Sequence, residues 1–170
     1  MSDPRWICEA LERHERALVA FAARITGDLE SARDVVQDTF VKLCAARREE
    51  VEPRLAEWLF TTCRHGAIDV QRRRSRQVLT EAANMDAHRS AASTLAEVET
   101  KDEGKRALEL LAALPPEQQE VLRLRFQSGL TYREIASVTG QSIGNVGWRI
   151  HEGLLALRAR LAGDALERTV

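Results

Sequence analysis

The sequence predicts an all-α protein made of two small helical domains joined by a flexible linker. No run of alternating Val, Ile or Thr, the pattern of a half-buried strand, occurs in the 170 residues. The four prolines and nine glycines lie largely at the ends of periodic apolar segments. Residues 80–101 are rich in Ala, Ser, Thr and acidic residues and hold too few large apolar groups to fold alone. We therefore expect domains at 1–77 and 104–170, with residues 78–103 as the linker.

The composition is that of a soluble globular protein, with 44% hydrophobic and 30% charged residues. The formal net charge is −1, so any surface that binds nucleic acid has to come from local clustering of basic residues. Such a cluster lies between Arg64 and Gln77, where there are five arginines and one acidic residue. No signal peptide is evident and no apolar run approaches the roughly 20 residues of a membrane span, so we expect no membrane insertion.

The cysteine and histidine content argues against a disulfide, a metal site and an enzyme active site. Cys8, Cys44 and Cys63 are odd in number and widely spaced, which favours reduced thiols in a cytoplasmic protein. The four histidines form no recognisable metal or triad set, and no phosphate-binding glycine loop is present. We expect no cofactor, no metal, no small-molecule substrate and no catalytic activity.

The first two helices are predicted from their caps and their apolar spacing. Asp3 and Pro4 suit the first positions of a helix that ends at Gly27. Asp28 can cap a second helix at about 29–46. The inward positions are Ile7, Leu11, Leu18, Phe21 and Ile25 in the first helix, and Ala32, Val36, Phe40 and Leu43 in the second.

The outer face of the second helix combines acidic and amide side chains with an apolar one. Its members, at spacings i, i+3, i+4 and i+7, are Asp34, Gln37, Asp38 and Val41. Such a face can be solvated, or it can dock a basic helix of a partner protein. The pattern leaves both interpretations open.

The third helix, at 55–76 after a polar connector at 47–53, has the strongest functional pattern. One side is apolar, and the other carries aromatic, polar and basic side chains. Because bases stack on aromatic rings and guanidinium groups bind phosphates, the outer side suits a strand whose bases are unstacked. A charged helix end in solvent is the alternative interpretation. The inner side is Leu55, Leu59, Cys63, Ala67 and Val70; the outer side is Trp58, Thr61, His65, Asp69 and Arg72, followed by Arg73, Arg74 and Arg76.

The second domain has clear helix boundaries. Residues 104–114 and about 117–127 are predicted helices separated by a Pro-Pro pair. Thr131 and Glu134 form a capping box for a short helix that ends near Gly140.

A last helix follows, capped by Ser142. Two helices joined by a glycine-containing turn are the helix-turn-helix pattern, so this domain is predicted to be a helix-turn-helix domain. The inner face of the last helix is Ile143, Val146, Ile150, Leu154, Leu157 and Leu161, and the outer face is Asn145, Trp148, Arg149 and Glu152.

Together these segments resemble the bacterial extracytoplasmic-function (ECF) sigma factors of RNA polymerase. Residues 32–40 (ARDVVQDTF) are similar to the family's segment that binds the coiled coil of the largest polymerase subunit. Residues 57–76 (EWLFTTCRHGAIDVQRRRSR) are similar to the segment that melts and reads the minus-ten promoter element. Residues 107–136 resemble the start of the carboxy-terminal region, and residues 143–150 (IGNVGWRI) resemble the helix that reads the minus-thirty-five element. The resemblance covers roughly residues 18–161.

The resemblance implies roles for the residues and partners for the chain. The partners would be core RNA polymerase, promoter DNA and an anti-sigma factor, and the loop at 46–54 would help hold a flipped base. Core polymerase would be bound by Asp34, Gln37, Asp38 and Val41; the minus-ten element by Trp58, Arg64, His65, Asp69, Arg72, Arg73, Arg74 and Arg76; and the minus-thirty-five element by Ser142, Asn145, Trp148, Arg149 and His151.

The chain departs from the family pattern in both DNA-reading segments. His65 stands where the family usually has Asn, so we do not expect the usual minus-ten sequence to be read. In the last helix only Arg149 is a permanent cation, which should flatten the salt dependence of binding. Trp148 would contact a thymine methyl group there or pack on a protein partner. The helix that often precedes the first domain is expected to be missing.

The resulting hypothesis is a promoter-specificity subunit without an active site of its own. The alternative is a sigma-like decoy or interaction module that binds an anti-sigma factor or polymerase without productive promoter use, as the charge-poor last helix suggests. A free-standing helix-turn-helix repressor is a third possibility, but it leaves the pattern of residues 57–76 unexplained.

Overall fold

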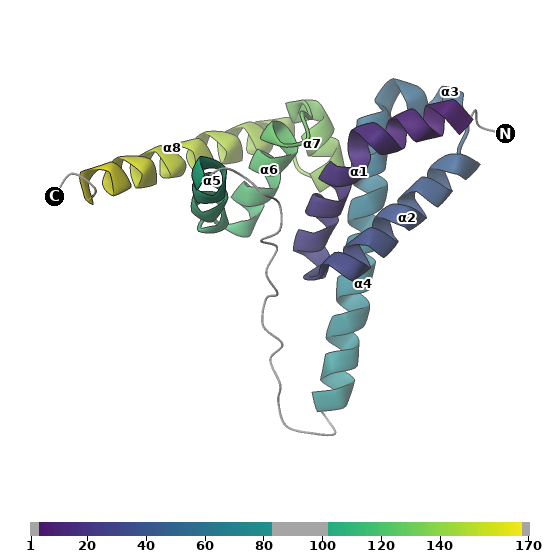
Figure 1. Ribbon diagram of the computed structural model, residues 1–170, viewed down its shortest axis with the longest axis horizontal. Coiled ribbons are helices and arrows are strands. Elements are labelled where there is room, and N and C mark those ends of the chain that lie inside the picture. The colour runs from purple at the N-terminus through teal and green to yellow at the C-terminus, as the bar shows by residue number, and fades with distance from the viewer. Residues whose placement is uncertain (1–3, 83–101, 168–170) are drawn as a thin grey trace. The chain divides into compact units, whose positions relative to one another are not determined.

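The computed structural model describes residues 4–82 and 102–167, and every regular element within them is a helix (Figure 1). The helices fall into two compact units, which confirms the all-α prediction. Most of the predicted linker, residues 83–101, lies outside the described ranges. The first unit contains α1 (Pro4–Thr26), α2 (Leu29–Ala45), α3 (Arg48–Val51), the 3-10 helix η1 (Glu52–Arg54) and α4 (Leu55–Ala82); the second contains α5 (Asp102–Ala112), α6 (Pro116–Phe126), α7 (Tyr132–Thr139) and α8 (Ile143–Glu167).

The first unit is built on the packing of α1, α2 and α4 around a common core. Leu18, Leu43 and Leu59, one from each helix, are fully buried. The rings of Phe21 and Phe60 meet edge to face with centroids 5.4 Å apart. The core also explains a glycine, because a Cβ at Gly66 of α4 would lie only 3.1 Å from Val35 Cγ1 of α2. The burial of apolar area by these three helices dominates the stability of the unit.

The predicted inner faces of this unit need one correction and one addition. Leu11 was expected inside α1 but is 37% exposed, whereas Trp6 and Ala10 are buried. Leu11 lies seven residues before Leu18 and so shares its face, but nearer the start of α1 the buried side is the one that carries Trp6 and Ala10. In α4 the fully buried Phe60 extends the predicted seam.

The predicted polar connector is helical, and this corrects the expectation of an irregular segment. The guanidinium of Arg48 lies 5.5 Å from the ring centroid of Trp6. It also donates to both carboxylate oxygens of Glu52, at 3.0 and 2.8 Å. The same hydrogen bonds hold the pKa of Glu52 below its ordinary value. Val51 is buried between these polar contacts, so the segment from α3 to η1 is fixed against α1.

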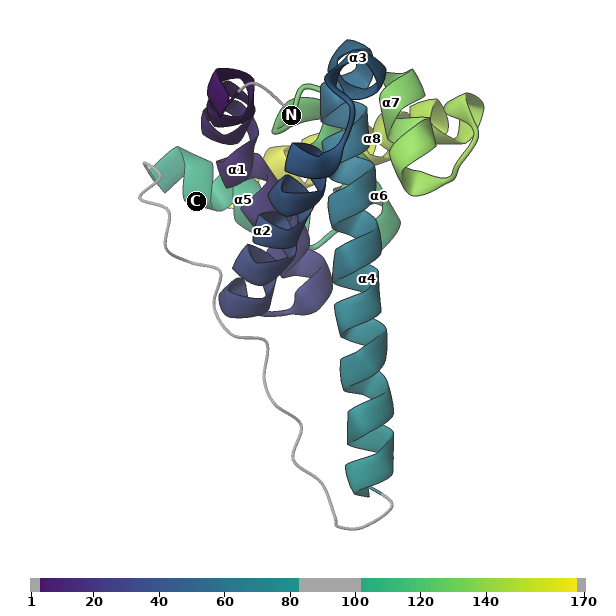
Figure 2. The ribbon, with the colours of Figure 1, turned by 90° about the vertical axis from the view of Figure 1, so that its right-hand side faces the viewer.

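The helix α4 runs six residues beyond the predicted end at Arg76, to Ala82. Its second half extends past α1 and α2 (Figure 2), and residues 71–80 are all exposed. Arg74 ties this half to the turn between α1 and α2. Its Nη1 donates to the carbonyl oxygen of Thr26 at 3.0 Å and to Asp28 Oδ2 at 2.7 Å. Asp28 also caps α2 by accepting from the Ser31 amide at 2.8 Å.

The second unit is built on the packing of α6 and α7 against α8. The predicted capping box of α7 is present, and Gly140 ends α7 with a positive φ of 70°. Ser142 caps α8, because its Oγ accepts from the Asn145 amide at 3.1 Å. A Cβ at Gly153 of α8 would lie 2.8 Å from Leu122 Cδ1 of α6, so the glycine lets these helices approach closely.

The inner face of α8 is confirmed at its centre and wrong at its ends. Val146 and Ile150 are buried, but Ile143 is 52% and Leu161 49% exposed. The reason is the length of the helices, because α8 has 25 residues whereas α6 and α7 have 11 and 8. The ends of α8 therefore extend beyond the helices that could cover them. Within the described ranges, no helix combines the length and hydropathy needed to cross a membrane.

Replacing Asp28 by Ala should destabilise the first unit, because it removes the α2 cap and the partner of Arg74. We expect urea unfolding followed by circular dichroism to show a loss of about 1–2 kcal/mol at pH 7. The hydrogen bonds from the Ser31 amide and from Arg74 hold the pKa of Asp28 below its ordinary value of 3.8. A carboxylate with a lowered folded-state pKa stabilises the fold above its unfolded pKa, and this contribution fades as pH falls through the folded value. The deficit should therefore be full at pH 7 and shrink below about pH 4.

Asp38→Ala is the matched control, because it removes an exposed carboxylate from the same helix. It should leave the free energy of unfolding unchanged at pH 7 and at pH 3. An equal loss in the two variants, or an Asp28→Ala deficit that stays constant down to pH 3, would contradict the assigned contacts.

Candidate nucleic-acid interface

The outer face of α2, which we call the α2 face, is exposed to solvent. All four of its predicted members are exposed, and Val41 is 62% exposed. Thr39 of the same helix turns inward instead, where its hydroxyl donates to the Val35 carbonyl at 2.8 Å. The face therefore combines two carboxylates, an amide and an uncovered apolar side chain. This composition suits a partner helix that carries both basic and apolar side chains. The members are Asp34, Gln37, Asp38 and Val41.

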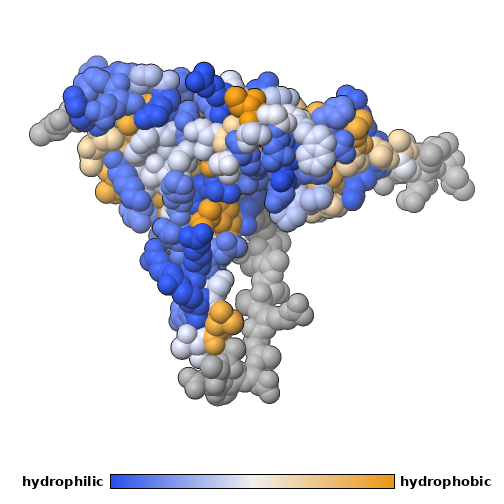
Figure 3. All heavy atoms as spheres, turned by 180° about the vertical axis from the view of Figure 1, so that it is seen from behind, coloured by the Kyte–Doolittle hydropathy of each residue, from blue (hydrophilic) through white to orange (hydrophobic). Residues whose placement is uncertain are grey.

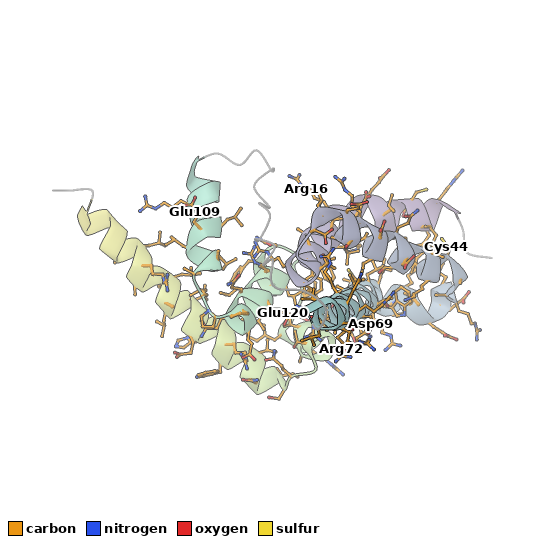
Figure 4. All side chains as sticks on the ribbon, turned by 90° about the horizontal axis from the view of Figure 1, so that it is seen from below. Arg16, Cys44, Asp69, Arg72, Glu109 and Glu120 are labelled. Atoms are coloured by element: carbon orange, nitrogen blue, oxygen red, sulfur yellow. The ribbon has the colours of Figure 1, made fainter. Side chains whose placement is uncertain are left out.

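The outer face of α4 forms one continuous stripe along the helix, which we call the α4 stripe. Its members are spaced three or four residues apart, so they follow one line on the surface. Trp58 is half-buried at the start of the helix, and His65 is exposed. Asp69 and Arg72 are exposed as well (Figure 4). Arg76 continues the line, with its Nε 3.4 Å from the Arg72 carbonyl oxygen, to which it donates. The α4 stripe comprises Trp58, Thr61, His65, Asp69, Arg72 and Arg76.

The structure separates Arg74 from the α4 stripe, although the sequence grouped it with the neighbouring arginines. Cys63, Ala67, Val70 and Arg74 follow one helical line, which is the buried side of α4. The guanidinium accordingly lies against Thr26 and Asp28 rather than along the α4 stripe. Helical periodicity alone indicates this separation, because Arg74 is in line with the predicted apolar side of the helix.

The remaining candidates on the first unit lie close to the α4 stripe in sequence. Arg73 is exposed and Arg64 is half-buried. The segment at 46–54 leads directly into the turn of α4 that carries Trp58, and its backbone is fixed by the Arg48 contacts. Figure 3 shows that the projecting part of α4 is hydrophilic along most of its length, with an apolar group near its end. That group consists of Val78 and Leu79, which are 58% and 71% exposed.

On the second unit, α8 presents only part of its predicted outer face. Trp148 is 58% exposed, and Ser142 and His151 are exposed. Asn145 is half-buried and donates through Nδ2 to Gln141 Oε1 at 3.1 Å. Arg149 pairs with Glu117 of α6 and keeps only 19% of its side chain exposed.

The sequence reasoning missed one basic residue of the second unit. Arg133 is exposed in the first turn of α7, the first helix of the helix-turn-helix. The first helix of such a motif generally crosses the DNA backbone. The position of Arg133 two residues after the capping Thr131 could have identified it from the sequence.

The described residues provide no metal centre. Across the two described ranges, no group of three or more His, Cys, Asp or Glu side chains is placed to hold a metal ion. Burial raises the pKa of the Cys63 thiol to about 12, so this cysteine is not a thiolate near neutral pH.

Two protein-family models match separate parts of the chain. The family model of Sigma-70 region 2 matches residues 10–77, which include the α2 face and the α4 stripe. The model of Sigma-70, region 4 matches residues 105–157, which include the helix-turn-helix.

Individual relatives extend the match along most of the chain. The ECF RNA polymerase sigma factor SigL of Mycobacterium tuberculosis is 32% identical over 88% of this chain and 85% of that protein. The ECF RNA polymerase sigma factor SigE of Mycolicibacterium smegmatis is 29% identical over 96% of this chain, which spans 64% of the length of that relative. Among solved structures, the sigma factor RpoE in complex with the anti-sigma factor NepR from Bartonella quintana has a TM-score of 0.66 at 27% identity, over 91% of this chain and 95% of that one.

Proposed function

The chain belongs to the extracytoplasmic-function sigma factors of RNA polymerase, which direct the polymerase to promoters, and we propose that it does so through the α2 face, the α4 stripe and the outer surface of α7 and α8. Sigma factors are transcription initiation factors and not enzymes. Residues 1–77 would form the polymerase-binding and minus-ten domain, residues 104–170 the minus-thirty-five domain, and residues 78–103 the connection. The protein would work in the cytoplasm, where bacterial polymerase meets its promoters.

The α2 face is proposed as the contact with core polymerase. Its carboxylates Asp34 and Asp38 would attract a basic helix, and the uncovered Val41 would add apolar area. The burial pattern supports this proposal, because α2 devotes its opposite side entirely to the core of the unit. The outward side is therefore available without any rearrangement of the fold.

A variant carrying Asp34→Ala and Gln37→Ala should bind core polymerase about tenfold more weakly, because it loses a charge and a hydrogen-bonding group at the interface. Fluorescence anisotropy of labelled protein titrated with core polymerase measures this. Glu12→Ala, which removes an exposed acidic residue from α1, is the control and should bind as the parent does. Parental affinity in the double variant would remove the docking assignment.

The α4 stripe is proposed as the track of the opened minus-ten strand, and its geometry is the observation that carries the function. An indole at one end can stack on a base, and the guanidinium groups of Arg72 and Arg76 at the other can hold phosphates. His65 and Asp69 lie between them on the same line. The fixed segment at 46–54 beside Trp58 is the proposed support for a flipped base.

A variant carrying Arg72→Ala and Arg73→Ala should reduce the yield of open promoter complexes about tenfold while its affinity for core polymerase stays within about twofold. Permanganate reactivity of unpaired thymines reports the opening, and co-elution with polymerase reports the binding.

Arg74→Ala is the matched control within the same arginine run. Because its guanidinium is engaged with Thr26 and Asp28, this change should lower thermal stability rather than open-complex yield at a temperature where the variant is folded. If Arg74→Ala impaired opening as much as the double variant at that temperature, the track would be wrongly placed.

The second unit is proposed to bind the minus-thirty-five element, with α8 in the major groove and Arg133 on a phosphate. An anti-sigma factor is a further proposed partner, because the RpoE structure similar to this chain was solved in complex with one. Nothing in this proposal requires a cofactor.

A second candidate function is favoured by the pairing of Arg149 with Glu117, which leaves the outer face of α8 without an open permanent cation between residues 143 and 152. In that case the chain would be a decoy that occupies polymerase or an anti-sigma factor without productive promoter use. Transcription in vitro from genomic fragments, with polymerase reconstituted with the chain, separates the two. Specific initiation sites support the promoter-directing function, and their complete absence would support the decoy.

A further inference from the structure

The outer surface of α8 is unusual for a helix that reads DNA, because its charge is turned inward. Arg149 is the sole Lys or Arg between residues 143 and 152, and its guanidinium pairs with Glu117 of α6. Asn145 is likewise engaged with Gln141. Between residues 143 and 150, α8 therefore offers a partner no open cation, and the largest exposed group there is the indole of Trp148.

A second observation is a glycine with no internal explanation. A glycine inside a helix costs about 1 kcal/mol relative to alanine. Gly153 of α8 is explained by close packing, because a Cβ there would lie 2.8 Å from Leu122 Cδ1. At Gly144 an added Cβ would meet nothing within 4 Å, so neither packing nor backbone conformation requires a glycine.

Gly144 and Trp148 are four residues apart and so lie one turn apart on the same face. A missing side chain beside a projecting indole leaves the helix backbone open to close approach by an outside surface. Gly147 differs from Gly144, since a Cβ there would be in ordinary contact with the Tyr132 side chain at 3.7 Å. The combination fits a flat, largely apolar target better than a phosphate.

We propose that Gly144 and Trp148 read the upstream promoter element by close approach of α8 to the base edges and by contact of the indole with thymine methyl groups, without a cationic reading residue. This inference rests on the proposed function of the second unit. A thymine methyl is the main apolar group that a base pair shows in the major groove. Backbone binding would then fall to groups outside this surface, such as Arg133 of α7.

The test uses the full chain bound to core polymerase and a promoter mapped from the transcripts that increase when the chain is overproduced. Each thymine of the upstream element is replaced in turn by deoxyuridine, which removes the methyl and keeps the base pair. Wild-type holoenzyme should bind about fourfold more weakly for each methyl in contact. Trp148→Ala should bind the unmodified promoter more weakly and show no further loss on replacement, whereas Trp148→Phe should keep part of the sensitivity.

Two glycine variants test the close approach. Gly144→Ala should weaken promoter binding about tenfold, although alanine favours the helix. Gly163→Ala is the matched control, because a Cβ there also meets nothing within 4 Å but lies far along α8 from the reading turn. It should leave promoter affinity unchanged.

The outcomes separate this inference from the function on which it rests. Specific promoter binding that is indifferent to every thymine replacement, or equally sensitive in Trp148→Ala, overturns the thymine reading alone. If Trp148→Ala weakens capture by core polymerase and leaves DNA binding intact, Trp148 is a protein contact and the inference is wrong. If no promoter can be mapped and no fragment is bound specifically, both the inference and the promoter-directing function fail.

Discussion

The packing of the buried side of α4 against α1 and α2 is the constraint on which the rest of the first unit depends. Because Leu59, Cys63 and Ala67 are buried, the line of residues opposite them has to face solvent. The same packing fixes the direction of α4. The hydrogen bonds of Arg74 to Thr26 and Asp28 also hold α4 to the α1–α2 turn. The α4 stripe and the α2 face are therefore held by one core. Docking on polymerase and gripping an opened strand would be geometrically coupled.

Much of this was accessible from sequence because it follows from helical periodicity and capping chemistry. The α2 face, the central part of the α4 stripe and the capping box at Thr131 required only spacing and residue type. The errors arose where a tertiary contact decides the outcome. The buried Trp6 is contacted by Arg48 from a different helix, and Arg48 belongs to the segment that the sequence presented as a polar connector. Leu161 is apolar and in phase, yet exposed, because the partner helices of α8 are shorter.

Charge proved harder to place than apolar surface. Arginines were grouped by proximity in sequence, but Arg74 and Arg149 are used inside their own units, paired with Asp28 and Glu117. Which cations stay available depends on acidic residues 46 and 32 positions away, which local patterns do not reveal. The two units consequently differ in chemistry. In the proposed function the first would offer guanidinium groups to an opened strand, and the second would offer the exposed indole of Trp148 to the duplex.

The central claim is that the unpaired strand lies along the α4 stripe and not on the opposite side of the projecting helix. Photo-crosslinking from a benzoylphenylalanine introduced at position 72 or at position 78 tests it most directly. Both positions are exposed, but at 3.6 residues per turn Val78 lies well around the helix from Arg72. In open promoter complexes we expect crosslinks to the non-template strand from position 72 and few from position 78. Crosslinks of equal yield from both positions, or from position 78 alone, would contradict the account.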